Sequence, residues 1–428
     1  MTVADAAAPA PGIPSPAAPA VRFIGDMQAY WGLLVRGAAL LAVTLGIYRF
    51  WYATDVRRFL WSNTEIQGET LEYTGTPYEL LIGFLIAIAL LVPLYLALAV
   101  AGLSMGTIGQ LISSLSFPLL FFLGQFAVYR ARRYRLTRTI YRGVRCHQDG
   151  SALRYAVCTS FWWLAIILTL GLAYPFMQSR LERFKMRHTY YGNLQGRFEG
   201  SGFRLFFRGL PMWIMVIGPL AFALAYSVAT VEWDKVSAAA ISAASSSDFL
   251  NQLETAFPAV YGAILVSVVG LTVSVLAAAV LFPIFQAMVL RWWISGLRLG
   301  PVSVRSDLRT GRIYGAYMRF LGYGLLFAIA AGIAGSVIFL SVTSALKARG
   351  KPEWAEVVNA GAGVISYVVM MLGYSAIYQG TVKLALWRSG MESMALDGAA
   401  ALDTVKAEGA ASSPVGEGLA DALNVGGF

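Results

Sequence analysis

Long apolar segments alternate with short polar ones along most of the chain. Eight of these segments reach roughly 20 residues, the length at which a helix crosses the hydrocarbon core of a bilayer. They cover residues 31–51, 79–102, 108–129, 152–176, 205–230, 257–290, 313–344 and 357–382. The pattern predicts a mainly α, polytopic membrane protein with six to eight transmembrane helices.

The basic residues between the segments indicate which segments cross, because Lys and Arg collect in cytoplasmic loops. If all eight cross, the two sides carry 15 and 13 basic residues, which is no bias. If 31–51 and 152–176 each leave and return on one face, the counts become 24 inside and 4 outside. We therefore expect six full crossings and two re-entrant or interface-lying segments. Eight plain crossings are the alternative.

The two exceptional segments share a local break. It reads Thr44-Leu45-Gly46 in the first and Thr169-Leu170-Gly171 in the second. Glycine accommodates a sharp bend there, and Pro175 ends the second segment. Trp162 and Trp163 lie within the second segment, and tryptophan prefers the membrane interface. A helix lying on the membrane surface therefore stays open beside a re-entrant one.

An internal repeat occupies the polar stretches. Its copies are RFLWSNTEIQGETLEYTG (58–75), RYRLTRTIYRGVRCHQDG (133–150) and RFKMRHTYYGNLQGRFEG (183–200), and a diverged copy begins at Arg291. Each of the first three has Arg before an aromatic residue, Thr six residues after the Arg and Gly seventeen after it. Homologous loops normally face one side of the membrane, so we expect these copies to be cytoplasmic.

Within each copy the pattern changes from helical to alternating. In the first, Thr64 and Ile66 precede a Gln67-Gly68 turn, and Leu71 and Tyr73 follow it. Alternation around a glycine turn predicts a short β-hairpin. We expect Thr to cap or begin each hairpin and Gly to supply a turn conformation. These residues are Thr64, Thr139, Thr189, Gly75, Gly150 and Gly200.

The ends of the chain differ from its middle. Residues 1–20 are rich in Ala and Pro and lack the basic and apolar parts of a signal peptide, so we expect a disordered tail. Residues 390–428 are rich in Ala, Gly and Ser, and we expect a second disordered tail there. The membrane domain is predicted to cover residues 21–389.

The overall composition agrees with a membrane protein: 57% of residues are hydrophobic, 13% are charged and the mean hydropathy is +0.63. A soluble fold of this length cannot bury so much apolar surface. The net charge of +10 suggests nucleic acid at first, but the arginines flank apolar segments. We therefore expect the lipid bilayer and its anionic headgroups as partners, and no nucleic acid.

The stretches TLGIYRFW and RRFLWSNTEIQGETLEYTGTP, together with RFIGD at 22–26, resemble the YjgN family of bacterial inner-membrane proteins. The resemblance covers residues 21–388. Relative to the family pattern, Arg36 stands in place of Asn, Phe50 in place of Pro and Leu71 in place of Phe. The family has no assigned function, so the resemblance implies a multi-pass protein of the inner membrane and no catalytic residues.

Catalytic and metal motifs are weak in this sequence. GLSMG (102–106) matches the pattern of a nucleophilic serine at Ser104, but it lies in a turn between two apolar segments, far from His147 and His188. Cys146 beside His147 is no metal site. We expect no enzyme activity, no cofactor and no metal.

The remaining candidates are arginines. Arg58, Arg133 and Arg183 are positioned to contact lipid headgroups or to anchor helix ends, and Arg36, Arg208 and Arg319 to contact an anion within the membrane or to extend toward lipid phosphates. The leading hypothesis is a transporter-like or lipid-associated inner-membrane protein. The alternative is a membrane scaffold whose basic cytoplasmic hairpins bind anionic lipid or a protein partner. The oligomeric state stays open.

Overall fold

The computed structural model describes residues 20–104, 106–242, 258–350, 353–409 and 413–423. Most of the described residues are helical, and six helices are long and apolar enough to cross a membrane. They are α3 (Pro77–Ser104), α4 (Gly106–Thr137), α7 (Gly202–Thr230), α10 (Pro258–Gly296), α11 (Thr310–Ala348) and a sixth that runs through α12 (Glu353–Tyr378), the π-helix η1 (Gln379–Lys383) and α13 (Leu384–Glu392). The expected multi-pass membrane class is confirmed.

The two exceptional segments form pairs of shorter helices. These are α1 (Met27–Val43) with α2 (Arg49–Ser62), and α5 (Ala152–Leu168) with α6 (Tyr174–Arg187). Both α1 and α5 have 17 residues, which gives a length of about 25 Å. The hydrocarbon core is about 30 Å thick. Neither helix is therefore long enough to cross it without distortion.

The Thr-Leu-Gly breaks have the same geometry in both pairs. The hydroxyl of Thr44 donates to the carbonyl of Leu40 at 2.7 Å and accepts from the amide of Tyr48 at 3.0 Å. The hydroxyl of Thr169 makes the equivalent bonds at 2.7 and 3.0 Å. Gly46 and Gly171 have φ of 90° and 95°, values that glycine adopts readily. Each threonine thus links the end of one helix to the start of the next.

Ten short strands in the described residues form one antiparallel sheet in chain order, and the sheet is nearly closed. They are β1 (Val21–Phe23), β2 (Thr64–Ile66), β3 (Glu69–Tyr73), β4 (Thr139–Tyr141), β5 (Val144–Gln148), β6 (Thr189–Tyr191), β7 (Leu194–Phe198), β8 (Leu297–Leu299), β9 (Val302–Ser306) and β10 (Met394–Asp397). Tight turns join the strands within a hairpin. Gln67-Gly68 and Arg142-Gly143 both have positive φ, as two-residue hairpin turns require.

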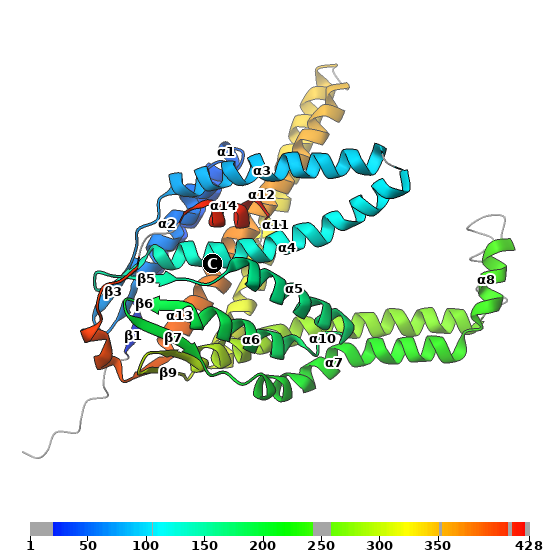
Figure 1. Cartoon of the computed structure of the whole chain (residues 1–428). Helices are drawn as coiled ribbons and strands as arrows, with labels where there is room; N and C mark the ends of the chain where they lie inside the picture. Colours follow the sequence, from blue (N-terminus) through cyan, green and yellow to red (C-terminus); the bar gives the residue numbers. More distant parts are fainter. Residues whose placement is uncertain (1–19, 105, 243–257, 351–352, 410–412, 424–428) are drawn as a thin grey trace, which may run out of the picture.

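Every group of helices leaves the sheet from one strand and returns to the neighbouring strand (Figure 1). Val21 pairs with Ile66 across α1 and α2, and Gln148 pairs with Thr189 across α5 and α6. The three groups of long helices, α3–α4, α7–α10 and α11–α13, also begin and end at paired strands. Since paired strands lie side by side, both ends of each group lie at the same end of the molecule. Each short helical pair therefore begins and ends at the end of the molecule that carries the sheet.

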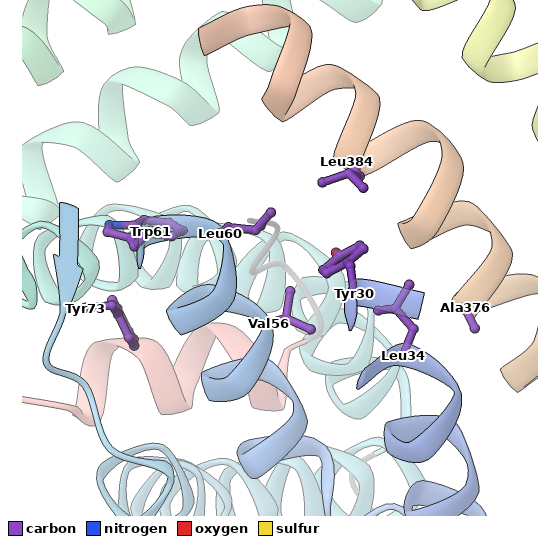
Figure 2. Packing of buried hydrophobic residues seen from close by; sticks show 8 residues of the cluster. All are labelled: Tyr30, Leu34, Val56, Leu60, Trp61, Tyr73, Ala376 and Leu384. Atoms are coloured by element: carbon purple, nitrogen blue, oxygen red, sulfur yellow. The ribbon is translucent and has the colours of Figure 1, made fainter. Parts of the chain in front are cut away.

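The helices form a ring. Each consecutive pair from α1 to α12 is in contact, with α7 followed by α10, and α12 closes the ring by contacting α1. A cluster of buried residues holds this closure (Figure 2). Tyr30 and Leu34 of α1 pack there with Val56 of α2, Ala376 of α12 and Leu384 of α13. The first and last helical groups are thereby joined.

One hydrogen bond indicates how deep the short pair α5–α6 reaches. The indole of Trp213 in α7 donates to the carbonyl of Leu170, at the tip of the pair, at 2.7 Å. Trp213 lies about 16 Å along α7 from Gly202 at the α-helical rise. Half of the hydrocarbon core is about 15 Å. The tip of the pair therefore packs against the side of α7, away from the sheet.

The C-terminal region differs from the disordered tail expected for 390–428. Met394–Asp397 form β10 on the edge of β9, η2 (Ala399–Thr404) follows as a 3-10 helix, and Val415–Ala422 form helix α14. Leu402, Glu417 and Ala420 are buried. Helix α14 packs between α3 and α4. Small residues give a disordered composition but also permit close helix packing. Of the N-terminal tail, residues 1–19 lie outside the described part.

The shared sheet predicts which loops face the same compartment. With Cys146 and Cys158 replaced by Ala, single cysteines at positions 70, 140, 195 and 305 should all react with an impermeant maleimide from one side of oriented vesicles. A cysteine at Ser104, at the far end of α3, should react only from the other side. Labelling of 140 and 195 from opposite sides would contradict this arrangement.

Candidate functional site

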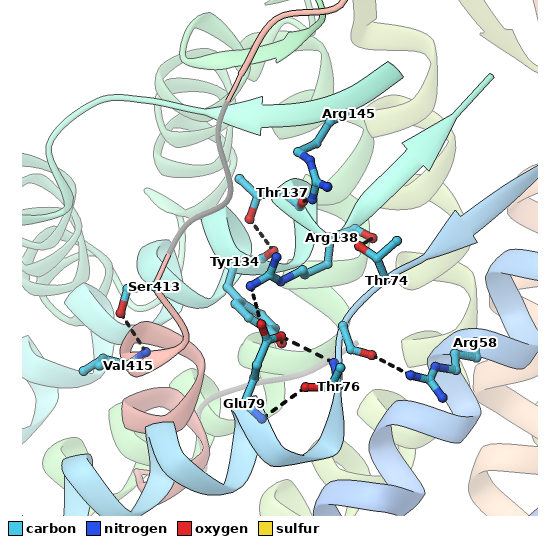
Figure 3. Close-up of polar contacts among 11 residues, drawn as sticks. Arg58, Thr74, Thr76, Glu79, Tyr134, Thr137, Arg138, Arg145, Ser413 and Val415 are labelled. Atoms are coloured by element: carbon cyan, nitrogen blue, oxygen red, sulfur yellow. Dashed lines mark hydrogen bonds and ion pairs between the residues drawn. The ribbon is translucent and has the colours of Figure 1, made fainter. Parts of the chain in front are cut away.

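Each repeat arginine is bonded to a backbone carbonyl seventeen residues further along the chain. One guanidinium nitrogen of Arg58 donates to the carbonyl of Gly75 at 3.0 Å (Figure 3). Arg133 bonds the carbonyl of Gly150 at 2.5 Å, and Arg183 that of Gly200 at 3.3 Å. Arg291 makes the same bond to Leu308, also seventeen residues further on. Each arginine ties the end of one helix to the entry of the next.

The repeat threonines act at the same junctions. The hydroxyls of Thr64, Thr139 and Thr189 donate to helix carbonyls four residues earlier at 2.7, 2.9 and 2.8 Å. Thr64 also accepts from the indole of Trp387 at 2.9 Å, and Thr139 from that of Trp61 at 3.0 Å. The hydroxyls therefore link each hairpin to its helix and two hairpins to a tryptophan on another helix.

The repeat glycines differ from one another. Gly150 has φ of 86°, the left-handed conformation expected for a turn. Gly75 and Gly200 do not belong to the residues with positive φ. A Cβ atom at Gly75 would lie 2.6 Å from the ring of Tyr73, and one at Gly200 would collide with the ring of Phe198. These two positions require glycine for space and not for backbone conformation.

The positions beside the repeat arginines point inward. The residues directly before the three repeat arginines are Arg57, Arg132 and Glu182. Arg135 and Lys185 follow Arg133 and Arg183 by two residues, and Trp293 follows Arg291 in the same way in the diverged copy. Positions three apart share one face of a helix. We call the group that meets there, with two residues from the C-terminal part of the chain, the central cation cluster. It consists of Arg57, Arg132, Arg135, Lys185, Lys383, Glu182 and Glu417.

One half of the cluster centres on Glu417 of α14. Its carboxylate accepts a hydrogen bond from Arg57, and both side chains are at least nine-tenths buried. The Nε atom of Arg135 lies 3.8 Å from the other carboxylate oxygen. Arg57 also donates to the hydroxyl of Tyr73 at 3.2 Å. Lys383 is close enough to Arg57 and Arg135 to interact electrostatically. The carboxylate of Glu417 thus contacts two cations, Arg57 and Arg135.

The other half centres on Glu182 of α6. Its carboxylate accepts from Lys185 and, at 2.9 Å, from the indole of Trp293. Burial raises the pKa of Glu182, but the charges of Lys185 and Arg132 outweigh burial and hold the pKa below its ordinary value. Glu182 is therefore ionised at neutral pH.

Arg132 is the least satisfied member of the cluster. Among the described residues its buried Nη1 atom has no hydrogen-bond partner, and its Nη2 atom lies 3.6 Å from the sulfur of Met186. Buried polar groups normally have partners, and each exception calls for an explanation.

A second basic site lies at the base of the short pair α5–α6. We call it the arginine cleft, and its volume is 560 Å³. Its lining residues are Arg154, Arg180, Arg183, Phe184, Arg187, His188, Arg197, Phe198 and Glu199. Glu199, the acid that lines it, pairs with Arg298 at 3.0 Å, and Asp149 beside it is hydrogen-bonded to His188 at 2.8 Å. The cleft therefore carries a large excess of positive charge.

An apolar groove continues from the arginine cleft. Its volume is 770 Å³, and it shares Arg180, Arg183 and Phe184 with the cleft. Beyond them it is lined by Cys158, Trp162, Leu181 and the rings of Phe176 and Phe203. We call it the aromatic groove. Cleft and groove together form one site with a charged end and an apolar end.

The three inner arginines lie apart. Arg36 of α1 is 3.9 Å from Asp55, Arg208 is exposed on α7, and Arg319 of α11 lines a pocket of 570 Å³ together with Arg312 and Arg388. The sequence offered them as a set. The structure places them on three different helices.

The remaining chemical candidates are also separated. The hydroxyl of Ser104 donates to the carbonyl of Val100 within α3 at 2.7 Å, whereas His147 lies in β5 and His188 follows α6 at the sheet. His147 stacks on the ring of Tyr190, with ring centroids 5.0 Å apart. In the part of the chain that the structure describes, no three His, Cys, Asp or Glu side chains meet in a group that could hold a metal ion.

The repeat glycines generate a stability prediction. Gly75→Ala should lower the melting temperature of the purified protein, because the new methyl overlaps the ring of Tyr73. Such overpacking costs about 1–3 kcal/mol. Gly32→Ala in α1 is the matched control, since a Cβ there meets nothing within 4 Å. The control should leave the melting temperature unchanged or raise it slightly. Equal effects of both substitutions would contradict the steric role of Gly75.

Comparison with known proteins assigns the chain to a family. No curated protein and no solved structure matches the chain. A family described as bacterial proteins of unknown function (DUF898), which is the YjgN family, matches residues 18–422, nearly all of the described part. The match includes the C-terminal helix α14 as well as the ring of helices. The chain therefore belongs to the YjgN family of bacterial proteins of unknown function.

Proposed function

We propose that this protein resides in the bacterial inner membrane, with its sheet in the cytoplasm, and binds anionic phospholipid in the arginine cleft. The placement of the sheet is supported by the charge of the loops. The repeats belong to the segments that hold 24 of the basic residues, against 4 in the segments at the other ends of the long helices. Basic residues stay on the cytoplasmic side.

The position of the arginine cleft fits a headgroup site. Arg154 lies in the first turn of α5, and Arg187 is the last residue of α6. Arg197 lies on β7, beside the start of α7. All three are therefore at the junction of helices and sheet, the level at which a membrane-spanning helix meets the lipid phosphates.

The shape of the combined site fits a phospholipid. Arginine binds phosphate through its planar set of donors. The aromatic groove starts where the cleft ends and is lined by Trp162, Phe176 and Phe203, which suit an acyl chain. A soluble phosphate compound would fill the cleft alone. The continuity of charged cleft and apolar groove is the observation that carries the proposal.

Lipid binding gives a second testable prediction. Arg154, Arg180, Arg187 and Arg197 are changed together to Gln, whereas Arg183 is kept because it holds Gly200. Each basic residue near an anionic surface contributes about 1 kcal/mol. The fourfold variant should therefore bind phosphatidylglycerol at least roughly a hundredfold more weakly in native mass spectrometry, with phosphatidylcholine as the neutral reference.

The control variant changes Arg312 and Arg388 to Gln, two exposed or part-exposed arginines that line a different pocket. It should keep the wild-type preference for phosphatidylglycerol. If the fourfold variant also keeps that preference, or if the control loses it equally, the arginine cleft is not the headgroup site.

A further inference from the structure

A pocket of 570 Å³ lies where α1, α11 and the sixth long helix meet, at the closure of the ring. Met27 and Trp31 of α1 line one side of it, and Arg319 and Tyr323 of α11 line another. The π-helix η1 and helix α13 supply the rest of the wall. We call it the Arg319 pocket. Its size is that of a small-molecule site, and its walls combine apolar side chains with a few polar groups, as such sites do.

The charged groups of the pocket leave one arginine without a counterion. Glu392 of α13 lies 3.4 Å from Arg312 and 2.7 Å from Arg388, so it serves both of them. Within the described part of the chain, Glu392 is the one acid that lines the pocket, and Arg319 forms no ion pair there. The positive charge of Arg319 is therefore available to a ligand.

Arg319 lies deeper than the other two arginines. It follows the start of α11 at Thr310 by nine residues, which corresponds to about 14 Å along the helix axis. The headgroup region on each side of a bilayer is only about 5–7 Å thick. Because the sheet stays outside the hydrocarbon core, the guanidinium begins its course from a backbone position within the core. A cation at this depth is costly without a partner and typically marks a functional site.

The backbone keeps the space beside Arg319 open. Gly311 and Gly315 line the pocket, and a Cβ atom at either position would meet nothing within 4 Å. They precede Arg319 by eight and four residues, so they share its face of the helix. Gly380 differs, because its Cβ would lie 2.5 Å from the ring of Trp31. No packing contact requires glycine at 311 or 315, although glycine in a helix costs about 1 kcal/mol relative to alanine.

An irregular helix forms part of the same wall. Gly380 and Thr381 line the pocket and belong to the π-helix Gln379–Lys383. Such π-helical turns are rare and are frequent at functional sites. This irregularity is independent of the charge of Arg319 and of the open glycine face.

We propose that the Arg319 pocket binds the carboxylate of a long-chain fatty acid, with Arg319 as its counterion. One cation without a partner matches one carboxylate. A phospholipid carries its phosphate between glycerol and headgroup, at the level of Arg312 and Arg388, whereas a fatty acid carries its charge directly on the chain and can lower it to Arg319. Tyr323 and Leu326 continue the same face of α11 and are exposed, which gives the chain an apolar path. The proposal does not depend on lipid binding in the arginine cleft.

The test uses native mass spectrometry of the full-length protein released from phosphatidylcholine nanodiscs. Palmitate is the probe, and hexadecanol is its uncharged counterpart of the same length. The wild type should bind palmitate roughly tenfold or more tightly, because a hydrogen bond to a charged group contributes about that factor. Arg319→Gln should abolish the difference. Arg208→Gln is the matched control, since Arg208 is exposed on another long helix, α7, and this variant should keep the preference.

A second pair of variants tests the space. Gly315→Leu places a side chain in the pocket and should lose the binding of both probes. It displaces no packed atom, and leucine favours a helix more than glycine does, so its melting temperature should not fall. Gly32→Leu in α1 is the matched control, because a Cβ there also meets nothing within 4 Å and Gly32 lies outside the pocket. This variant should bind both probes as the wild type does.

Three results would overturn the proposal: equal binding of palmitate and hexadecanol by the wild type, a palmitate preference that survives Arg319→Gln, or normal binding by Gly315→Leu. Phosphatidylglycerol tests the alternative occupant. Its addition to the nanodiscs should leave palmitate binding unchanged, and displacement of palmitate would assign the pocket to a phospholipid instead. The fourfold arginine-cleft variant should bind palmitate as the wild type does, so the two proposals fail separately.

Discussion

Hydrogen bonding between neighbouring strands is the interaction on which the rest of this structure depends. Each hairpin is too short to be stable alone. Each of the ten described strands is hydrogen-bonded to its neighbours in chain order. Backbone groups at open sheet edges cannot be satisfied in lipid, so the sheet lies outside the hydrocarbon core. Every helix that starts at one strand must then return to the next. The sheet thereby determines the course of the whole chain through the membrane.

The lengths of the helical groups follow from this constraint together with the bilayer thickness. Long groups reach the other side and return, whereas α1–α2 and α5–α6 turn at the Thr-Leu-Gly break. The repeat arginines face the chain entering the next helix, whereas the positions beside them face the central cation cluster. The same repeat therefore produces structural ties at Arg58, Arg133 and Arg183 and the charged interior that contains Arg57 and Arg132.

Much of the fold was accessible from the sequence, and less of the site. Apolar length and loop charge gave the multi-pass class and separated 31–51 and 152–176 from the other segments. Sequence could not distinguish the roles of Arg57 and Arg58, because the identity of two adjacent basic residues does not show which side chain faces inward. It also missed α14: Gly416 and Gly418 read as low complexity, yet they allow the backbone contact that inserts Glu417. Such long-range packing leaves no local signal.

The re-entrant depth of the short helical pairs tests this account most directly. Spin labels placed singly at positions 45 and 170, in nanodiscs, can be located by the relative access of oxygen and of a water-soluble nickel complex. The account predicts that position 170 lies near the bilayer centre, with high oxygen access and low nickel access, and that position 45 is also within the hydrocarbon core. High nickel access at both positions would contradict it, because the pairs would then lie in water on either side of the membrane.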